Sequence, residues 1–154
     1  MSSSPTDRIE KEIVIRAPRA RVWRALTDPE EFGQWFGVRL ESAFAPGARV
    51  RGRITSPGYD HITLEVAVER MEPERSLAWR WHPHAIDTTR DYSAEPTTLV
   101  AFELADVPEG TRLTVVESGF DALPAARRAE AWRGNEGGWT AQVKNIERHV
   151  TGAR

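Results

Sequence analysis

The chain lacks cysteine altogether. None of its 154 residues is a cysteine, which excludes disulfide bonds, thiol nucleophiles, thiolate zinc sites and iron–sulfur clusters. The sequence also has no run of the roughly 18 apolar residues that span a bilayer, and its start has no apolar stretch typical of a secretory signal. We therefore expect a cytoplasmic protein that does not insert into membranes.

An excess of basic residues is missing as well. The chain carries 21 basic and 23 acidic residues, for a formal net charge of −2. Electrostatic docking on nucleic acid depends on a surplus of positive charge, so no nucleic-acid partner is expected. Lysine itself is scarce, because Lys11 and Lys144 are the only two, and arginine supplies the other basic side chains.

What the chain does have is one domain's share of apolar residues and six tryptophans. Hydrophobic residues make up 40% of the sequence, and a chain of this length buries roughly 70% of its unfolded surface in one core. Residues 1–7 are rich in Ser and Pro, and we expect them to form a disordered tail. Residues 8–151 are expected to form a single domain.

Hydrophobic spacing predicts the order of the elements. A strand is expected at 9–15, a short helix at 19–27, and a second short helix that Asp28 caps, with Glu31 as the capping-box carboxylate. Six further strands are expected at 38–44, 49–55, 62–71, 76–82, 97–105 and 111–118. An apolar stripe then predicts a long helix that ends near residue 151, with a kink or break at Gly134, Gly137 and Gly138.

This order predicts an α+β fold. A curved antiparallel sheet of about seven strands would wrap around the long C-terminal helix, with two short helices after the first strand. The polar segment at 83–96 is expected to be a functional rim or disordered. The charged run at 125–130 is expected on a solvated face, unless its arginines meet an acidic partner.

Six motifs follow one another along the chain: VWRALTDPE at 22–30, WF at 35–36, FEL at 102–104, GTRLTV at 110–115, ESGF at 117–120 and GW at 138–139. In this order they resemble the START-like helix-grip superfamily, also called SRPBCC. Within it the chain is most similar to the single-domain bacterial type of the group named for the C-terminal domain of the activator of heat-shock protein 90 ATPase. The resemblance covers about residues 8–150 and implies a helix-grip fold with an apolar cavity between helix and sheet. Its members range from lipid carriers to polyketide cyclases, so the fold does not fix the function.

Strand alternation indicates which side chains face that cavity. An aromatic wall of this kind suits a flat or apolar ligand, although aromatic residues at such spacing also form ordinary cores. The predicted ligand-binding residues are Trp35, Phe36, Trp79, Trp81, Phe102, Glu117, Trp139 and Val143.

Glu117 continues the inward parity of its strand. A buried carboxylate is costly unless it is paired, hydrogen-bonded or protonated. Two interpretations stay open. Glu117 is either a polar anchor or general acid/base in the cavity, or a structural carboxylate that reaches Arg80, a backbone amide or water at the cavity mouth.

Binding of a small hydrophobic or aromatic molecule, as a carrier or sensor, is the favoured function. One alternative is a cyclase/aromatase-like or hydrolase-like enzyme that uses Glu117, with Tyr92 or an arginine orienting the substrate. Another is a co-chaperone role with a chaperone or another protein as partner, which only the resemblance implies. No cofactor and no metal are expected, because His82 and His84 have no recognised ligand spacing. Monomer and homodimer both stay open.

Overall fold

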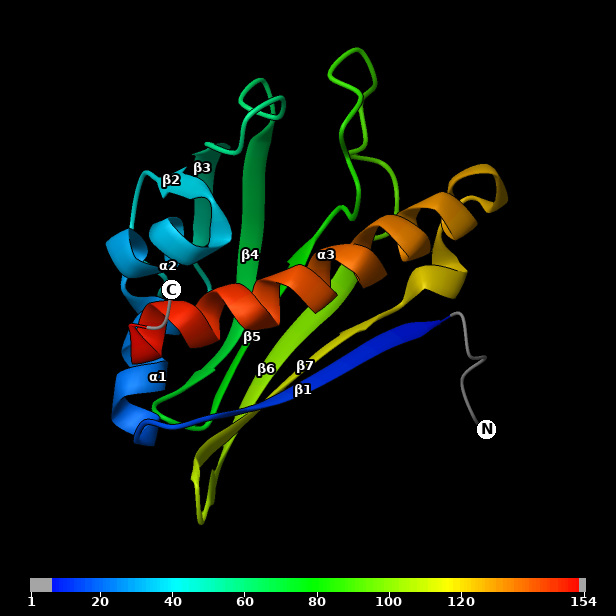
Figure 1. The fold of residues 1–154 in the computed structure, drawn as a ribbon. Helices are drawn as coiled ribbons and strands as arrows, with labels where there is room; N and C mark the ends of the chain where they lie inside the picture. Colours follow the sequence, from blue (N-terminus) through cyan, green and yellow to red (C-terminus); the bar gives the residue numbers. More distant parts are fainter. Residues whose placement is uncertain (1–6, 153–154) are drawn as a thin grey trace.

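Seven antiparallel strands form one sheet in the order β1-β7-β6-β5-β4-β3-β2. The structure is a computed structural model that describes residues 7–152. The strands are β1 (Arg8–Ile15), β2 (Val38–Leu40), β3 (Arg49–Ile54), β4 (Thr63–Glu72), β5 (Ser76–Trp81), β6 (Thr98–Val107) and β7 (Gly110–Ser118). Two short helices, α1 (Arg19–Thr27) and α2 (Pro29–Phe36), follow β1, and the long helix α3 (Ala125–Thr151) ends the fold after a 3-10 turn, η1 (Phe120–Ala122). The helix-grip prediction is confirmed (Figure 1).

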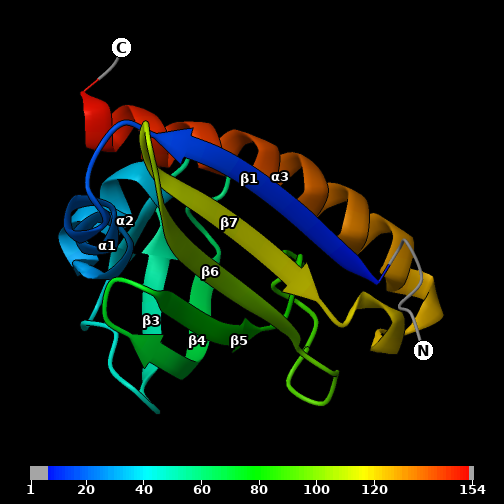
Figure 2. The ribbon, with the colours of Figure 1, turned by 90° about the horizontal axis from the view of Figure 1, so that it is seen from below.

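The sheet curves, and α3 crosses the face that carries the apolar side chains. Figure 2 shows α3 running beside β1, with α1 and α2 at the end of the sheet that the C-terminal half of α3 reaches. Period-two alternation buries one parity of each long strand, as in Val100, Phe102 and Leu104 of β6. The core therefore lies between the sheet and the three helices. Within residues 7–152, no helix is long and apolar enough to cross a membrane.

The N-terminal half of the fold follows its local signals closely. The carboxylate of Asp28 accepts the amides of Glu30 and Glu31, both at 3.0 Å, so the predicted N-cap is confirmed. The Glu31 side chain does not complete a capping box; it binds Arg21, Arg24 and His149 instead. Residues 1–6 of the expected tail lie outside the described residues, while the carbonyl of Asp7 already accepts backbone amides from the start of η1.

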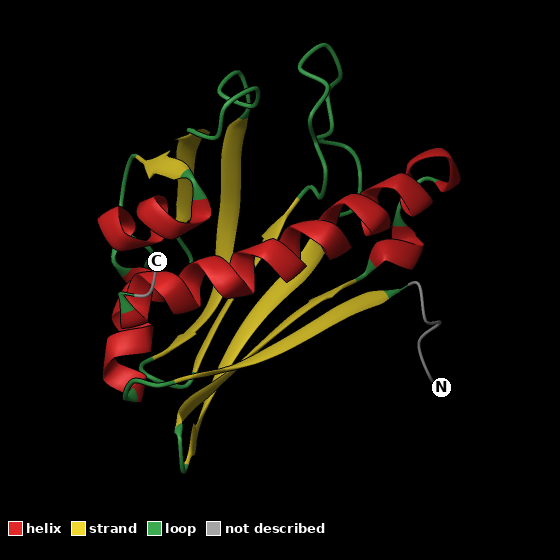
Figure 3. Ribbon diagram, in the orientation of Figure 1, coloured by secondary structure: helices red, strands yellow, loops and turns green. Residues whose placement is uncertain are grey.

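Helix α3 is one continuous helix, so the expected break at its glycines is wrong (Figure 3). A glycine inside a helix costs about 1 kcal/mol relative to alanine but keeps its N–H and C=O in the helical ladder, unlike a proline. Burial of Trp139, Val143 and Ile146 against the core compensates for that cost. The second predicted strand is also shorter than expected: β2 ends at Leu40.

Candidate functional site

Glu117 lies at the centre of the face that α3 covers. The register of the sheet places Val100 opposite Glu117 and Thr98 opposite Trp81. Three neighbouring strands, β5, β6 and β7, therefore bring Trp81, Thr98 and Glu117 together. The predicted inward orientation of Glu117 is correct, and its side chain is completely inaccessible to solvent.

The carboxylate of Glu117 is held entirely by neutral donors. The indole N–H of Trp139 donates to Oε1 at 2.8 Å, and that of Trp81 donates to Oε2 at 2.7 Å. The Thr98 hydroxyl donates to Oε2 at 2.6 Å. Nδ2 of Asn135 lies 3.0 Å from Oε1 and 3.1 Å from Oε2. Arg80, one partner considered from sequence, pairs with Glu69 instead.

Burial raises the pKa of Glu117 above its ordinary value, because a desolvated carboxylate is penalised. The hydrogen bonds from Thr98, Trp139, Trp81 and Asn135 favour the ionised form and offset part of this effect. No cation binds the carboxylate among the residues that the structure describes. The site thus holds a carboxyl group whose charge is stabilised only by dipoles.

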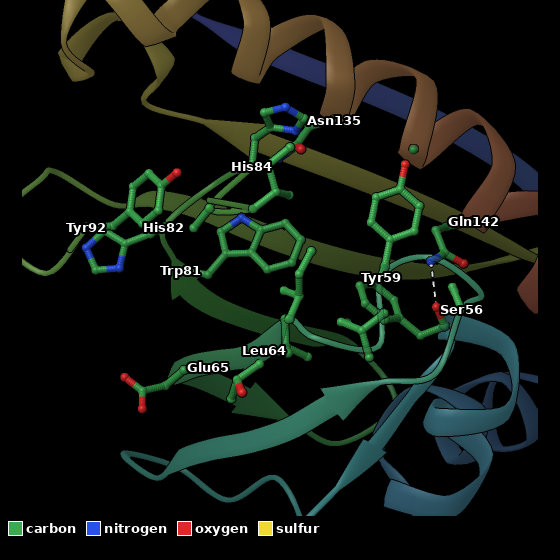
Figure 4. Close-up of a pocket in the computed structure, with 17 residues that line it drawn as sticks. Ser56, Tyr59, Leu64, Glu65, Trp81, His82, His84, Tyr92, Asn135 and Gln142 are labelled. Carbon is green, nitrogen blue, oxygen red and sulfur yellow. Dashed lines mark hydrogen bonds between the residues drawn. The ribbon is translucent and has the colours of Figure 1, made fainter. Parts of the chain in front are cut away.

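A pocket with a volume of about 410 Å³ lies beside this cluster. It opens between α3 and two loops that rise on the same side of the sheet, the β3–β4 turn and the β5–β6 loop (Figures 1 and 4). Its apolar wall consists of Phe36, Ile54, Tyr59, Ile62, Leu64, Trp81, Ala85, Ile86 and Tyr92. Its polar side chains are Ser56, Thr63, Glu65, His82, His84, Asn135 and Gln142.

The predicted ligand-binding residues are distributed unevenly around this pocket. Phe36 and Trp81 line it, and Trp139 borders a smaller space of about 80 Å³ next to it. Trp35 lines an adjoining groove between the end of α2 and α3, which shares Phe36 and Gln142 with the pocket. The remaining four, Trp79, Phe102, Glu117 and Val143, are buried and line none of these spaces.

Most of the aromatic residues pack against one another. Trp79 meets Trp81 edge to face, with ring centroids 4.8 Å apart, and Phe102 contacts both Trp79 and Trp139. The indole N–H of Trp79 has no hydrogen-bond partner within residues 7–152. The aromatic core therefore lies behind the pocket, and among its rings Phe36 and Trp81 line the pocket.

The β5–β6 loop is fastened over the pocket by Arg127. This side chain is only 7% exposed, so the solvated position expected for the 125–130 run is wrong for Arg127. It pairs with Glu95 at 2.9 Å, donates to the carbonyl oxygens of Pro83 and His84, and stacks over the ring of Tyr92. The acidic partner is thus a residue of the same chain, and the loop forms an ordered rim.

A glycine of α3 allows this loop to approach the helix closely. A Cβ at Gly134 would lie 2.7 Å from Nδ1 of His84. His84 itself adopts a left-handed conformation, with φ of 52°. At Gly138, by contrast, a Cβ would meet nothing within 4 Å, although this residue borders the pocket.

Metal chemistry has little support in this geometry. Within residues 7–152 there is no group of three or more His, Asp or Glu side chains close enough to hold a metal ion. Nε2 of His82 lies 3.1 Å from the carbonyl oxygen of Glu95, whereas His84 faces Glu130 at 3.6 Å. The two histidines therefore contribute to the rim separately.

Sequence reasoning missed Asn135, Thr98 and Tyr59. Asn135 precedes Trp139 by four residues, so both lie on one face of α3; that spacing was the available signal. Thr98 shares the inward parity of Phe102. Tyr59 lies in a Pro-Gly turn that carries no periodic signal.

Comparison with known proteins identifies similar sequences and folds. The profile of the family described as "Activator of Hsp90 ATPase homolog 1-like protein" matches residues 16–151. Comparison with curated proteins gives no match.

Solved structures share the fold over nearly the whole chain. Protein MLL2253 from Mesorhizobium loti is 24% identical, with a TM-score of 0.74 over 96% of this chain and 98% of that one. NE0264 from Nitrosomonas europaea is 20% identical, with a TM-score of 0.74 over 97% of both chains. DynU16, a protein in the dynemicin biosynthetic locus, is 27% identical, with a TM-score of 0.73 over 96% of this chain but 48% of its own.

Proposed function

Because the chain belongs to the activator of Hsp90 ATPase homolog 1-like family and its helix-grip fold leaves a pocket beside the middle of α3, we propose that it binds a small apolar or aromatic molecule there. The observation that carries this proposal is the pocket wall. Nine side chains with aromatic or aliphatic surface line it, and seven polar side chains are interspersed. This is the usual composition of small-molecule sites.

The size of the pocket fits a ligand of several fused or linked rings. Its volume of about 410 Å³ lies within the range of roughly 300–1,000 Å³ that is typical of such sites. The rings of Phe36 and Trp81 offer flat surfaces on which an aromatic ligand would stack.

The rim of the pocket supports the same interpretation. Among the described residues, only three large hydrophobic side chains are exposed, and two of them, Tyr59 at 53% and Ile86 at 39%, belong to this rim. They lie on the β3–β4 turn and the β5–β6 loop, which both contribute lining residues to the pocket. A bound apolar molecule would cover part of both side chains, which favours its binding.

Binding is better supported than catalysis by Glu117. A catalytic carboxylate must reach the reacting atoms within hydrogen-bond distance. Both oxygens of Glu117 are occupied by donors, and the residue does not line the pocket. Substrate would contact it only after Trp81 or Asn135 had moved aside.

The proposal is tested by filling the pocket from the helix. Leucine at Gly138 would project into open space at the pocket, and leucine at Gly137 would project away from it, since Gly137 does not border the pocket and nothing lies within 4 Å of either Cβ. We expect Gly138→Leu to weaken the binding of pyrene, followed by its fluorescence anisotropy, by at least about tenfold. Gly137→Leu is the matched control and should bind as the wild type does. Equal pyrene binding by both variants, or none by the wild type, would contradict the proposed site.

A further inference from the structure

Asn135 connects the pocket to Glu117. Its Nδ2 donates to both oxygens of the buried carboxylate, at 3.0 and 3.1 Å. Its carbonyl oxygen accepts no hydrogen bond from any residue between 7 and 152. Figure 4 shows the side chain at the pocket, below α3 and across from Trp81. One end of this amide is therefore committed to Glu117, and the other is available to a ligand.

The chemistry of Glu117 fixes which end faces the pocket. Each carboxylate oxygen already accepts an indole N–H, from Trp81 or Trp139, and indoles only donate. An ionised carboxylate has no proton to offer, so Asn135 must present its NH₂ group to it. If Glu117 is protonated, the Thr98 hydroxyl, which is its nearest partner at 2.6 Å, can accept the proton and leave the Asn135 NH₂ group as a donor to Glu117. With Glu117 ionised, Asn135 can only donate to it, and the Asn135 oxygen then faces away.

Two other polar side chains of the pocket, Gln142 and Tyr92, already have partners. Gln142 donates to the carbonyl oxygen of Phe36 at 2.9 Å, and its own oxygen accepts from Asn145 at 3.0 Å. The hydroxyl of Tyr92 accepts the amide of Asp87. An apolar ligand would strip water from the unpaired Asn135 oxygen, which is costly unless the ligand replaces that hydrogen bond.

We propose that the ligand is an apolar aromatic molecule with a hydroxyl or N–H group, which donates a hydrogen bond to Oδ1 of Asn135. Glu117 is the positioning residue, because it orients the amide without touching the ligand. This inference rests on the proposed function and specifies the chemical class of the ligand. It also explains why a carboxylate is buried behind an apolar pocket with no cation beside it.

The test compares three probes of nearly the same shape: pyrene, hydroxypyrene and methoxypyrene. Hydroxypyrene can donate a hydrogen bond, whereas the methyl ether cannot. We expect the wild-type protein to bind hydroxypyrene about tenfold more tightly than methoxypyrene, as fluorescence anisotropy would measure. Equal affinities for the two would overturn the inference and leave the proposed function intact, whereas no binding of any probe would overturn both.

Variants then assign the preference to the amide. Asn135→Leu should bring the ratio of the two affinities close to one while methoxypyrene still binds. Thr140→Leu, on the exposed side of α3, is the control and should keep the wild-type ratio. Persistence of the tenfold preference in Asn135→Leu would contradict the role of Asn135.

Glu117→Gln tests the positioning role separately. A glutamine amide can donate to the Asn135 oxygen, which would let the Asn135 amide turn and present NH₂ to the pocket. We expect the hydroxypyrene preference to fall by at least about threefold, with circular dichroism showing a folded protein. An unchanged ratio in the folded variant would show that Glu117 does not set the orientation. If this variant does not fold, the ratio in Asn135→Leu still decides the inference.

Discussion

Helix α3 contacts two carboxylates that are held in opposite ways. Opposite the middle of the helix, beside the pocket, Glu117 is surrounded by neutral donors, and burial raises its pKa. Near the C-terminal end of the helix, partial burial also acts to raise the pKa of the half-buried Glu31, but hydrogen bonds from His149, Arg21 and Arg24 outweigh it and hold the pKa below its ordinary value. Glu31 joins α1, α2 and α3 through Arg21, Arg24 and His149, whereas Glu117 is held by neutral donors beside a pocket. The difference shows that one carboxylate ties elements together and the other orients side chains.

Side-chain size on α3 follows the same division. The middle of the helix carries Gly134, Gly137 and Gly138, while Val143 and Ile146 nearer its C-terminus are buried against the core. Small residues leave space beneath the loops, and larger ones close the gap between helix and sheet. One helix thus borders the pocket with small residues and closes the core with larger ones.

The largest expected effect contrasts the two carboxylates directly. Glu117→Leu removes the acceptor for four donors, and two of these, Trp139 and Thr98, are too deeply buried to turn to water. At roughly 1–3 kcal/mol for each orphaned donor, we expect a loss of about 3 kcal/mol in the free energy of unfolding. Glu31→Leu breaks partly exposed pairs and should cost about 1 kcal/mol. Urea denaturation of both variants measures the difference, and equal losses would remove the contrast.

The pH dependence of stability should have opposite signs for Glu117 and Glu31. The folded-state pKa of Glu117 is raised, so its contribution to stability is fully present below the unfolded value, near 4.5, and is lost as the pH rises through the folded-state value. The folded-state pKa of Glu31 is lowered, so its contribution is present above about 4.5 and is lost as the pH falls through the folded-state value.

Replacing each glutamate with glutamine isolates its own contribution to the pH dependence of stability. As the pH rises above about 4.5, the free energy of unfolding of the wild type should fall relative to that of Glu117→Gln. As the pH falls below about 4.5, the free energy of unfolding of the wild type should fall relative to that of Glu31→Gln. Denaturation curves from pH 4 to 7 would measure the first and curves in more acidic buffers the second. Parallel trends for the two pairs would contradict the assignment of the two environments.

Sequence patterns predict which way several side chains of this site point, but not which distant residues they contact. Strand parity is a local property, so the inward orientation of Glu117 and Trp81 was predictable. The register that sets Trp81 opposite Thr98 depends on long-range pairing, which no single strand reveals. Arg127 looked like a surface charge because its partner, Glu95, lies 32 residues away in a segment without periodicity. The pocket wall was likewise hidden, since two loops supply much of it.

The smallest effects concern the three glycines of α3. Gly137→Ala and Gly138→Ala should each raise the free energy of unfolding by about 1 kcal/mol, because alanine favours the helix and its methyl group meets nothing within 4 Å. Gly134→Ala should gain less or lose stability, since its methyl group would lie 2.7 Å from the His84 ring. Thermal denaturation would show the first two as a rise of about 3 °C in Tm. An equal rise in Tm for all three variants would mean that the β5–β6 loop moves away from the added methyl group at little cost. A smaller rise in Tm for Gly134→Ala alone would show that the loop is held against α3 at the pocket.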